Sequence, residues 1–193
     1  MKKIALFVLV ATLFSLPSIA LSQMKVAVID MQKVFKEYSM TKKADEELKS
    51  SFSDYQKTYK DMLEDYQKMV EEAGKLRDEA NNEVLAEKVK EEKLKMYQAK
   101  VGEIRGYERK LKEFEITRRR QIEESGARMR KKIVEDITAQ VEKISASKEF
   151  NIVMDKSGMA ITGTPIVMYA AGLPDLTEEV ITTVNAASAQ QAN

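Results

Sequence analysis

Residues 41–76 have the sequence TKKADEELKSSFSDYQKTYKDMLEDYQKMVEEAGKL, in which apolar side chains recur at alternating steps of four and three residues. The members of this seam are Leu48, Phe52, Tyr55, Tyr59, Met62, Tyr66, Met69, Ala73 and Leu76. A heptad pattern sustained for four repeats is typical of a helix in a coiled coil. Tyr and Met make this stripe more adaptable than branched aliphatic residues would, although such stripes are most often core.

The helical pattern extends well beyond the seam, because no proline occurs in the 107 residues from Thr41 to Ser147. The seam fades over residues 77–83, where Asn81 and Asn82 favour a turn and can cap a following helix. We therefore expect an antiparallel hairpin of two helices. The first is roughly 60 Å long with Thr41 as its N-cap, and the second starts near Glu83 and is roughly 95 Å long. Since the second helix is longer, its end must pack on the rest of the chain or on another subunit.

Gly102 and Gly106 interrupt the second helix with residues of low helix propensity. Each costs about 1 kcal/mol relative to alanine inside a helix. They mark either tolerated weakness, close contact with another helix, or a hinge in an otherwise stiff rod, and the sequence leaves all three open.

Short apolar segments flank the hairpin. KVAVID (residues 25–30) and FNIVMD (residues 150–155) are predicted strands, and Asp30 is placed to cap a short helix over residues 31–38. Further strands are expected at residues 159–161 and 166–170, and Asp175 with Glu178 resembles a capping box for a helix ending near Asn185. The fold class is therefore α+β: a body from residues 23–40 and 148–185, an arm from residues 41–147, and a disordered tail at residues 186–193.

The predicted strands are apolar on both faces, yet a single chain has too little structure to cover both. Small sheets are marginal alone, and the chain has no cysteine with which to form a disulfide. We therefore expect the bodies of several chains to associate. The core of the shared body is expected to contain Val26, Val28, Ile152 and Met154.

The N-terminus is predicted to be a secretory signal peptide over residues 1–22. Two lysines precede an apolar run, and Ala20-Leu21-Ser22 fits the small-residue cleavage rule, with Ser18-Ile19-Ala20 as a competing site. The alternative is a membrane anchor, but the run is shorter than the roughly 20 apolar residues of a spanning helix, and Pro17 interrupts it. Removal of residues 1–22 takes away two lysines and no acid, so the net charge changes from +1 to −1.

The composition argues against catalysis. The chain contains no histidine and no cysteine, the commonest bases, nucleophiles and zinc ligands, and its seven glycines form no phosphate-binding loop. We predict no catalytic residue, no metal site and no cofactor. Basic residues do concentrate in residues 100–132, which carry 12 basic and 6 acidic side chains, but charge runs of this kind usually mark a solvated helix face.

The order of these motifs resembles the Skp/OmpH family of periplasmic chaperones. The resemblance covers essentially the whole chain after the signal peptide and rests on KVAVIDM (residues 25–31), VFKEY (residues 34–38), FNIVMD (residues 150–155) and DLTEEV (residues 175–180) at the two ends of a charged hairpin. It implies a homotrimer in which strands of three chains build a β-barrel body and three helical tentacles enclose a cavity. The best-known members are strongly basic, whereas this chain is near neutral.

The resemblance implies an ATP-independent holdase chaperone of the periplasm that keeps unfolded outer-membrane β-barrel proteins from aggregating, with peripheral membrane or lipopolysaccharide contact as a further partner. Residues expected to contact clients are Lys93, Met96, Arg105 and Arg109. The alternative is an envelope coiled-coil adaptor or scaffold with one defined partner. A nucleic-acid binder using residues 118–120 is disfavoured, because phosphate binding relies on an excess of basic charge.

Overall fold

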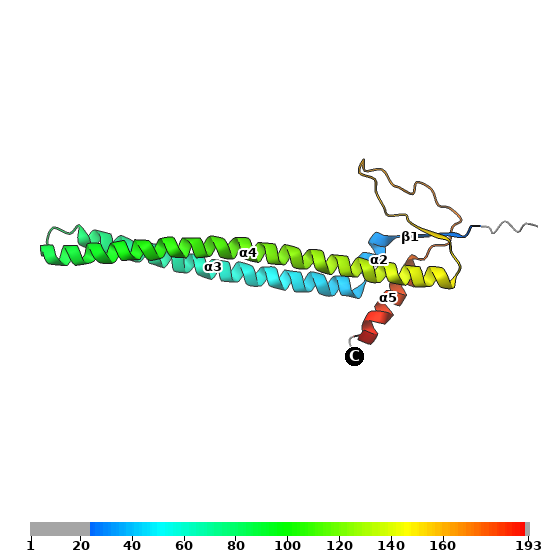
Figure 1. The fold of residues 1–193 in the computed structure, drawn as a ribbon, viewed down its shortest axis with the longest axis horizontal. Coiled ribbons are helices and arrows are strands. Elements are labelled where there is room, and N and C mark those ends of the chain that lie inside the picture. Colours follow the sequence, from blue (N-terminus) through cyan, green and yellow to red (C-terminus); the bar gives the residue numbers. More distant parts are fainter. Residues whose placement is uncertain (1–23, 192–193) are drawn as a thin grey trace, which may run out of the picture.

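The structure, a computed structural model, describes residues 24–191. The predicted signal peptide and its cleavage site lie outside these residues. The described chain is mostly helical, with a two-stranded sheet, and runs in the order β1 (Val26–Ile29), α2 (Met31–Glu37), α3 (Ser39–Ala80), α4 (Glu87–Ser147), β2 (Ile152–Asp155) and α5 (Thr177–Gln191). A long rod of two helices extends from a small body at one end (Figure 1).

The rod is the expected antiparallel hairpin of α3 and α4. The turn lies at residues 81–86, so α4 begins at Glu87 and not near Glu83 as predicted. The backbone N–H of Val84 donates to the side-chain oxygen of Asn82 at 3.0 Å, and this local turn keeps the following residues out of the helix.

The predicted seam of α3 faces α4. Tyr55 and Ala73 are buried, and the ring of Tyr55 stacks on that of Phe114 with centroids 6.0 Å apart. Other members of the seam are only half-buried, and Phe52 is 47 % exposed. The two helices therefore pack through a narrow contact that leaves part of the seam open to solvent.

The longer α4 reaches past the start of α3 and completes the core of the body, as its excess length required. Ile133 and Ile137 of α4 are buried in one cluster with Val34 of α2 and Val180 of α5. Ile137 has no exposed surface. The base of the hairpin is thus anchored in the body core, which fixes the rod to it.

The body is organised around two parallel strands. β1 and β2 pair in register from Val26 opposite Ile152 to Ile29 opposite Asp155. Ala27 and Ile29 face the core, and the N–H of Val28 donates to the carbonyl of Pro174 at 2.8 Å, which adds the segment before α5 to the other edge of β1. The first and last parts of the chain are thereby joined.

A single non-helical residue, Tyr38, separates α2 from α3. The N–H of Ser39 donates to the side-chain oxygen of Asn185 at 2.7 Å, and the Asn185 amide nitrogen donates to the carbonyl of Glu37 at 3.2 Å. The hydroxyls of Ser39 and Ser188 lie 2.8 Å apart. Helix α5 therefore supplies the polar groups that the start of α3 lacks.

This contact explains why the expected N-cap was wrong. Thr41 lies inside α3, is buried, and its hydroxyl has no hydrogen-bond partner within the described chain. The N-terminal contact comes from Asn185, which is 146 residues away from Ser39 in sequence. By contrast, Asp30 caps α2 as predicted and accepts from the N–H of Lys33 at 2.8 Å.

The segment between β2 and α5 departs furthest from expectation. In place of strands at residues 159–161 and 166–170, it forms a long loop that stands away from the helices (Figure 1), with one antiparallel bridge between Met159 and Pro165. A turn at Gly163, where φ is +79°, closes this bridge. The apolar residues suggested strands, but nothing in the described chain pairs with them along their length.

The end of the chain is also more ordered than expected. Helix α5 continues to Gln191, so residues 186–191 of the expected disordered tail are helical. Ser188 is buried against the base of α3, which extends the contact of α5 by a turn. The capping box was wrong as well, because α5 starts at Thr177 and the carboxylate of Glu178 pairs with Lys33 instead of its own helix.

Candidate functional site

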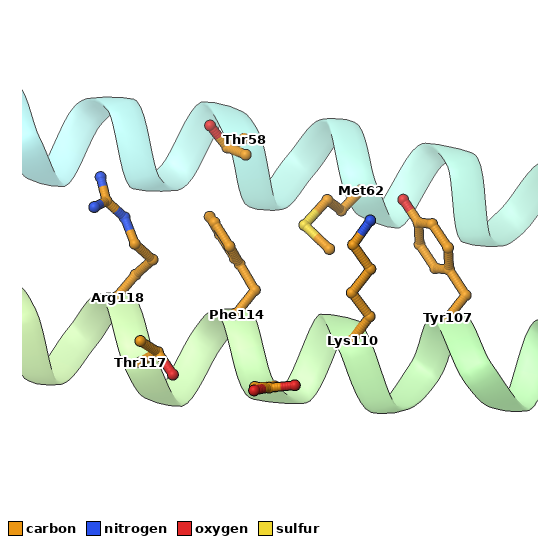
Figure 2. A pocket seen from close by; sticks show the side chains of 8 residues that line it. Thr58, Met62, Tyr107, Lys110, Phe114, Thr117 and Arg118 are labelled. Atoms are coloured by element: carbon orange, nitrogen blue, oxygen red, sulfur yellow. The ribbon is translucent and has the colours of Figure 1, made fainter.

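An open groove of about 540 Å³ lies between α3 and α4 near the middle of the rod. We call it the interhelical groove. Its floor is mostly apolar, and Figure 2 shows side chains of both helices converging on it. It is lined by Thr58, Met62, Tyr107, Lys110, Glu113, Phe114, Thr117 and Arg118.

An aromatic cluster borders the groove. On one side Phe114 stacks on Tyr55, which in turn stacks on Tyr59 at 5.8 Å between ring centroids. Beyond Phe114, the flexible side chain of Met62 extends from α3 toward α4 (Figure 2). The result is a concave, adaptable surface with an aromatic wall.

Two basic side chains border this apolar floor. Lys110 and Arg118 both extend from α4 toward α3, on either side of Phe114 (Figure 2). The ammonium of Lys110 lies 5.9 Å from the centroid of Tyr107, and Arg118 donates to Gln121 at 3.0 Å. Neither makes an ion pair with a carboxylate of residues 24–191, whereas the neighbouring Arg119 and Arg120 pair with glutamates.

Two tyrosines, Tyr107 and Tyr55, are held in their neutral form. Burial, assisted by the charge of Asp65, raises the pKa of Tyr107 above its usual value. Burial also raises the pKa of Tyr55, with a smaller contribution from Glu115. Their rings therefore act as uncharged packing and stacking surface at any physiological pH.

The residues predicted to contact clients do not form one surface. Lys93 faces the partner helix, since its ammonium pairs with Glu79 of α3 at 2.6 Å. Met96 is 48 % exposed, and Arg105 and Arg109 are exposed. At about 100° per residue, Arg105 and Arg109 lie about 120° and 160° around α4 from Lys93, so they lie on another side of the helix.

The groove itself was missed, although its sequence signal is present. Met62 belongs to the apolar seam of residues 48–76, which we interpreted as core, and Tyr107 and Phe114 are apolar residues of the second helix. Lys110, Phe114 and Arg118 are spaced four residues apart, which places the two cations on the same helix face as the aromatic ring.

Gly102 and Gly106 lie within an unbroken α4. A Cβ atom at Gly102 would meet nothing within 4 Å, and at Gly106 it would meet only a guanidinium nitrogen of Arg109 at 3.9 Å. Close contact with another helix of the described chain is therefore not their role. A hinge at these two glycines stays a prediction.

A second apolar surface lies on the body. The four residues expected in a shared core form two cross-strand pairs, Val26 with Ile152 and Val28 with Met154, and none of them belongs to the body's own core cluster. Of the four, Ile152 is 42 % and Met154 is 37 % exposed, whereas Val26 is half-buried and Val28 is buried. The adjoining loop exposes further large apolar side chains, namely Met159, Ile161, Ile166, Met168 and Tyr169.

The described residues contain neither a cluster of metal ligands nor a helix that could span a membrane. Across residues 24–191 no three acidic side chains come together in a way that could hold a metal ion. None of the helices in this part of the chain combines the length and the apolar character needed to cross a membrane.

Comparisons with known proteins agree with this architecture. The sequence profile of the family described as outer membrane protein, OmpH-like, matches residues 25–184. A similar fold occurs in the crystal structure of an OmpH-like protein from Caulobacter crescentus CB15 that is proposed to be an outer membrane chaperone, with a TM-score of 0.60, 13 % sequence identity and 85 % of each chain covered. The comparison with curated proteins found no match.

Proposed function

Because the chain belongs to the OmpH-like family of outer membrane proteins, we propose that it is a holdase chaperone that binds unfolded outer-membrane β-barrel proteins without ATP and prevents their aggregation. The observation that carries this proposal is the interhelical groove, an apolar surface that is open along a rod and bordered by two cations without an ion pair among residues 24–191. Such a surface suits a non-native chain, which exposes apolar and charged groups in no fixed arrangement.

Exposed apolar side chains elsewhere on the rod support the same proposal. They occur on both helices and at the turn, and include Phe52, Val70, Val84, Leu94, Met96 and Ile116. Each offers a weak contact, but several contacts to one flexible chain add avidity without any strong single site. Lys93, Met96, Arg105 and Arg109 remain proposed contacts of this kind, spread around α4.

We propose that three chains assemble through their bodies, with the rods projecting from a shared barrel. The partly exposed Ile152 and Met154 of β2 and the apolar loop after β2 support this arrangement, because a strand of another chain could cover these apolar side chains. Three rods around one cavity would multiply the contacts available to a client.

The proposed location is the periplasm, after cleavage of residues 1–22. The charged start, apolar run and small residues before Gln23 support it, and so does membership of an outer-membrane protein family. Peripheral contact with the membrane or with lipopolysaccharide is a further proposal of the same kind.

The decisive test is an aggregation assay. Several unrelated β-barrel membrane proteins, unfolded in urea, are diluted into buffer with residues 23–193 at stoichiometric amounts and no nucleotide, and light scattering is followed. We expect suppression for all of them. A folded coiled-coil protein of similar length serves as the control for unspecific surface effects.

Failure with every unfolded client would contradict the holdase. If the chain then bound one folded envelope protein tightly, the adaptor alternative would take its place.

A further inference from the structure

The interhelical groove carries a more specific inference about what it binds. Its two cations are separated by eight residues of α4, which corresponds to about 12 Å along the helix axis. Phe114 lies midway between them in sequence, and in Figure 2 its ring lies between their side chains. Along α4 the groove thus presents a positive charge, the aromatic ring of Phe114 and a second positive charge.

An extended polypeptide has a matching period. A strand advances about 3.3 Å per residue, so the side chains at its first and fifth positions are about 13 Å apart. The side chain at the third position lies between them on the same face of the strand. Two carboxylates at the first and fifth positions would therefore reach Lys110 and Arg118 while the third side chain contacts Phe114.

The charges of the groove favour this occupant. Glu113 also lines the groove, so the lining carries two positive charges and one negative charge. Lys110 and Arg118 lack ion-pair partners in the part of the chain that the structure describes, unlike Arg119 and Arg120, and would gain them from the ligand. A chain with carboxylates in both outer positions complements the cations, whereas a basic segment would be repelled by them.

We propose that the interhelical groove binds extended, non-native segments with the pattern acidic–any–aromatic or large apolar–any–acidic. This assigns a recognition pattern to one site of the proposed holdase and rests on that proposed function. The site lies within a single hairpin, between its two helices, and does not require a cavity between chains. Each contact is weak, with affinity for one short peptide of roughly 0.1–1 mM, and repeated segments in one client supply avidity.

The chain contains no tryptophan, which permits a direct binding assay. A peptide Gly-Asp-Ser-Trp-Ser-Asp-Gly with blocked ends has the proposed spacing, and Gly-Ser-Asp-Trp-Asp-Ser-Gly has the same composition and charge with the wrong spacing. Tryptophan fluorescence, titrated with residues 23–193, reports only on the peptide. We expect the first peptide to bind about fivefold more tightly than the second.

The groove is tested with matched charge variants. Lys110→Gln with Arg118→Gln removes its two cations and is expected to weaken the first peptide roughly five- to tenfold. Arg119→Gln with Arg120→Gln removes the same charge from the two residues that follow Arg118, which do not line the groove, and is expected to change binding less than about twofold. Circular dichroism and sedimentation should match the natural sequence for both.

Several outcomes would overturn the inference. The first is that the two peptides bind equally well, and the second is that both double variants lose the same affinity for the first peptide. The third is that the groove variants sediment differently from the natural sequence, which would assign the groove to a second copy of the chain. Binding of vesicles with anionic lipid that depends on Lys110 and Arg118, without peptide binding, would assign it to a lipid surface and also overturn it.

The aggregation assay separates this inference from the proposed function. If the natural chain suppresses aggregation but binds neither peptide, the groove inference is wrong and the holdase stands. If it binds the first peptide through Lys110 and Arg118 but suppresses no aggregation, the holdase is wrong.

Discussion

Asp175 is a charged residue on which several contacts of the body converge. Its carboxylate accepts from the ammonium of Lys156 at 2.6 Å and from the N–H of Thr177 at 2.9 Å. The hydroxyl of Thr177 also accepts from the N–H of Asp30, at the end of β1. Burial alone would raise the pKa of Asp175, but the hydrogen bonds from Lys156 and Thr177 outweigh it and lower the pKa to about 2. The ionised carboxylate therefore ties the start of α5 to the sheet.

This shift predicts a loss of stability in acid. Since the pKa of Asp175 is lowered on folding from 3.8, its contribution is complete above about pH 4 and is lost as the pH falls toward about 2. The shift alone corresponds to about 2 kcal/mol, but the side chain is 41 % exposed, so we expect about 1 kcal/mol. Urea unfolding between about pH 5 and pH 2.5 should show a steeper decline for the natural sequence than for Asp175→Asn.

The variant Asp175→Asn serves as the control for the natural sequence, because its amide oxygen can still accept a hydrogen bond from Thr177 but does not titrate. Equal slopes for the two proteins over this interval would show that Asp175 does not contribute.

Helix α5 stabilises the junction between α2 and α3. Asn185 satisfies Ser39 N–H and the Glu37 carbonyl at once. Asn185→Ala leaves both groups without that partner and is expected to lower the free energy of unfolding by about 1–2 kcal/mol, measured by urea or thermal unfolding.

Two further variants make this test specific. Asn185→Asp keeps the acceptor for Ser39 and places a negative charge at the N-terminus of α3, so we expect it to recover most of the loss. Gln190→Ala, at an exposed position of the same helix, should change stability by less than about 0.5 kcal/mol. If Asn185→Ala unfolds at the same urea concentration as the natural sequence, Asn185 does not stabilise the junction between α2 and α3.

Local patterns predicted the long elements well and their ends poorly. The four–three spacing from Leu48 to Leu76 predicted the hairpin, because heptads bury one stripe whatever the rest of the chain does. The start of α3 was misplaced because its contact comes from Asn185, which no local pattern reveals. The loop after β2 was misjudged because apolar residues predict a strand only where a neighbouring strand is available.

The interhelical groove could be predicted only in part. The seam identified Met62, but whether a seam residue fills the contact or borders a groove depends on how closely the two helices approach at that point. Spacing along one helix does not contain this information. The spacing of Lys110, Phe114 and Arg118 acquires its meaning once the neighbouring helix is known to leave the space open.

At the scale of the whole molecule, the exposed sheet face predicts assembly. Residues 23–193 should sediment as a trimer at micromolar concentration. Ile152→Lys with Met154→Lys places two charges on this face and should yield a folded monomer, because both side chains are already partly exposed in the single chain and lie outside its core cluster.

The control for this prediction is Met96→Lys, which adds a charge at an exposed apolar residue of the rod and should leave the mass unchanged. A natural protein that sediments as a folded monomer in analytical ultracentrifugation would contradict the shared body.

The pairing of β1 with β2 also determines the order in which the protein can fold. β1 and β2 lie 126 residues apart at each pair in the register, whereas the contacts within the hairpin close progressively from its turn. Contacts between such distant residues form slowly, because a long loop must close first. As the chain emerges from a ribosome or a translocon, β1 appears early and must wait without its partner until β2 follows. The α3–α4 rod can pair during that interval. The rod, which is proposed to hold clients, can therefore form before the body, which is proposed to hold the assembly together.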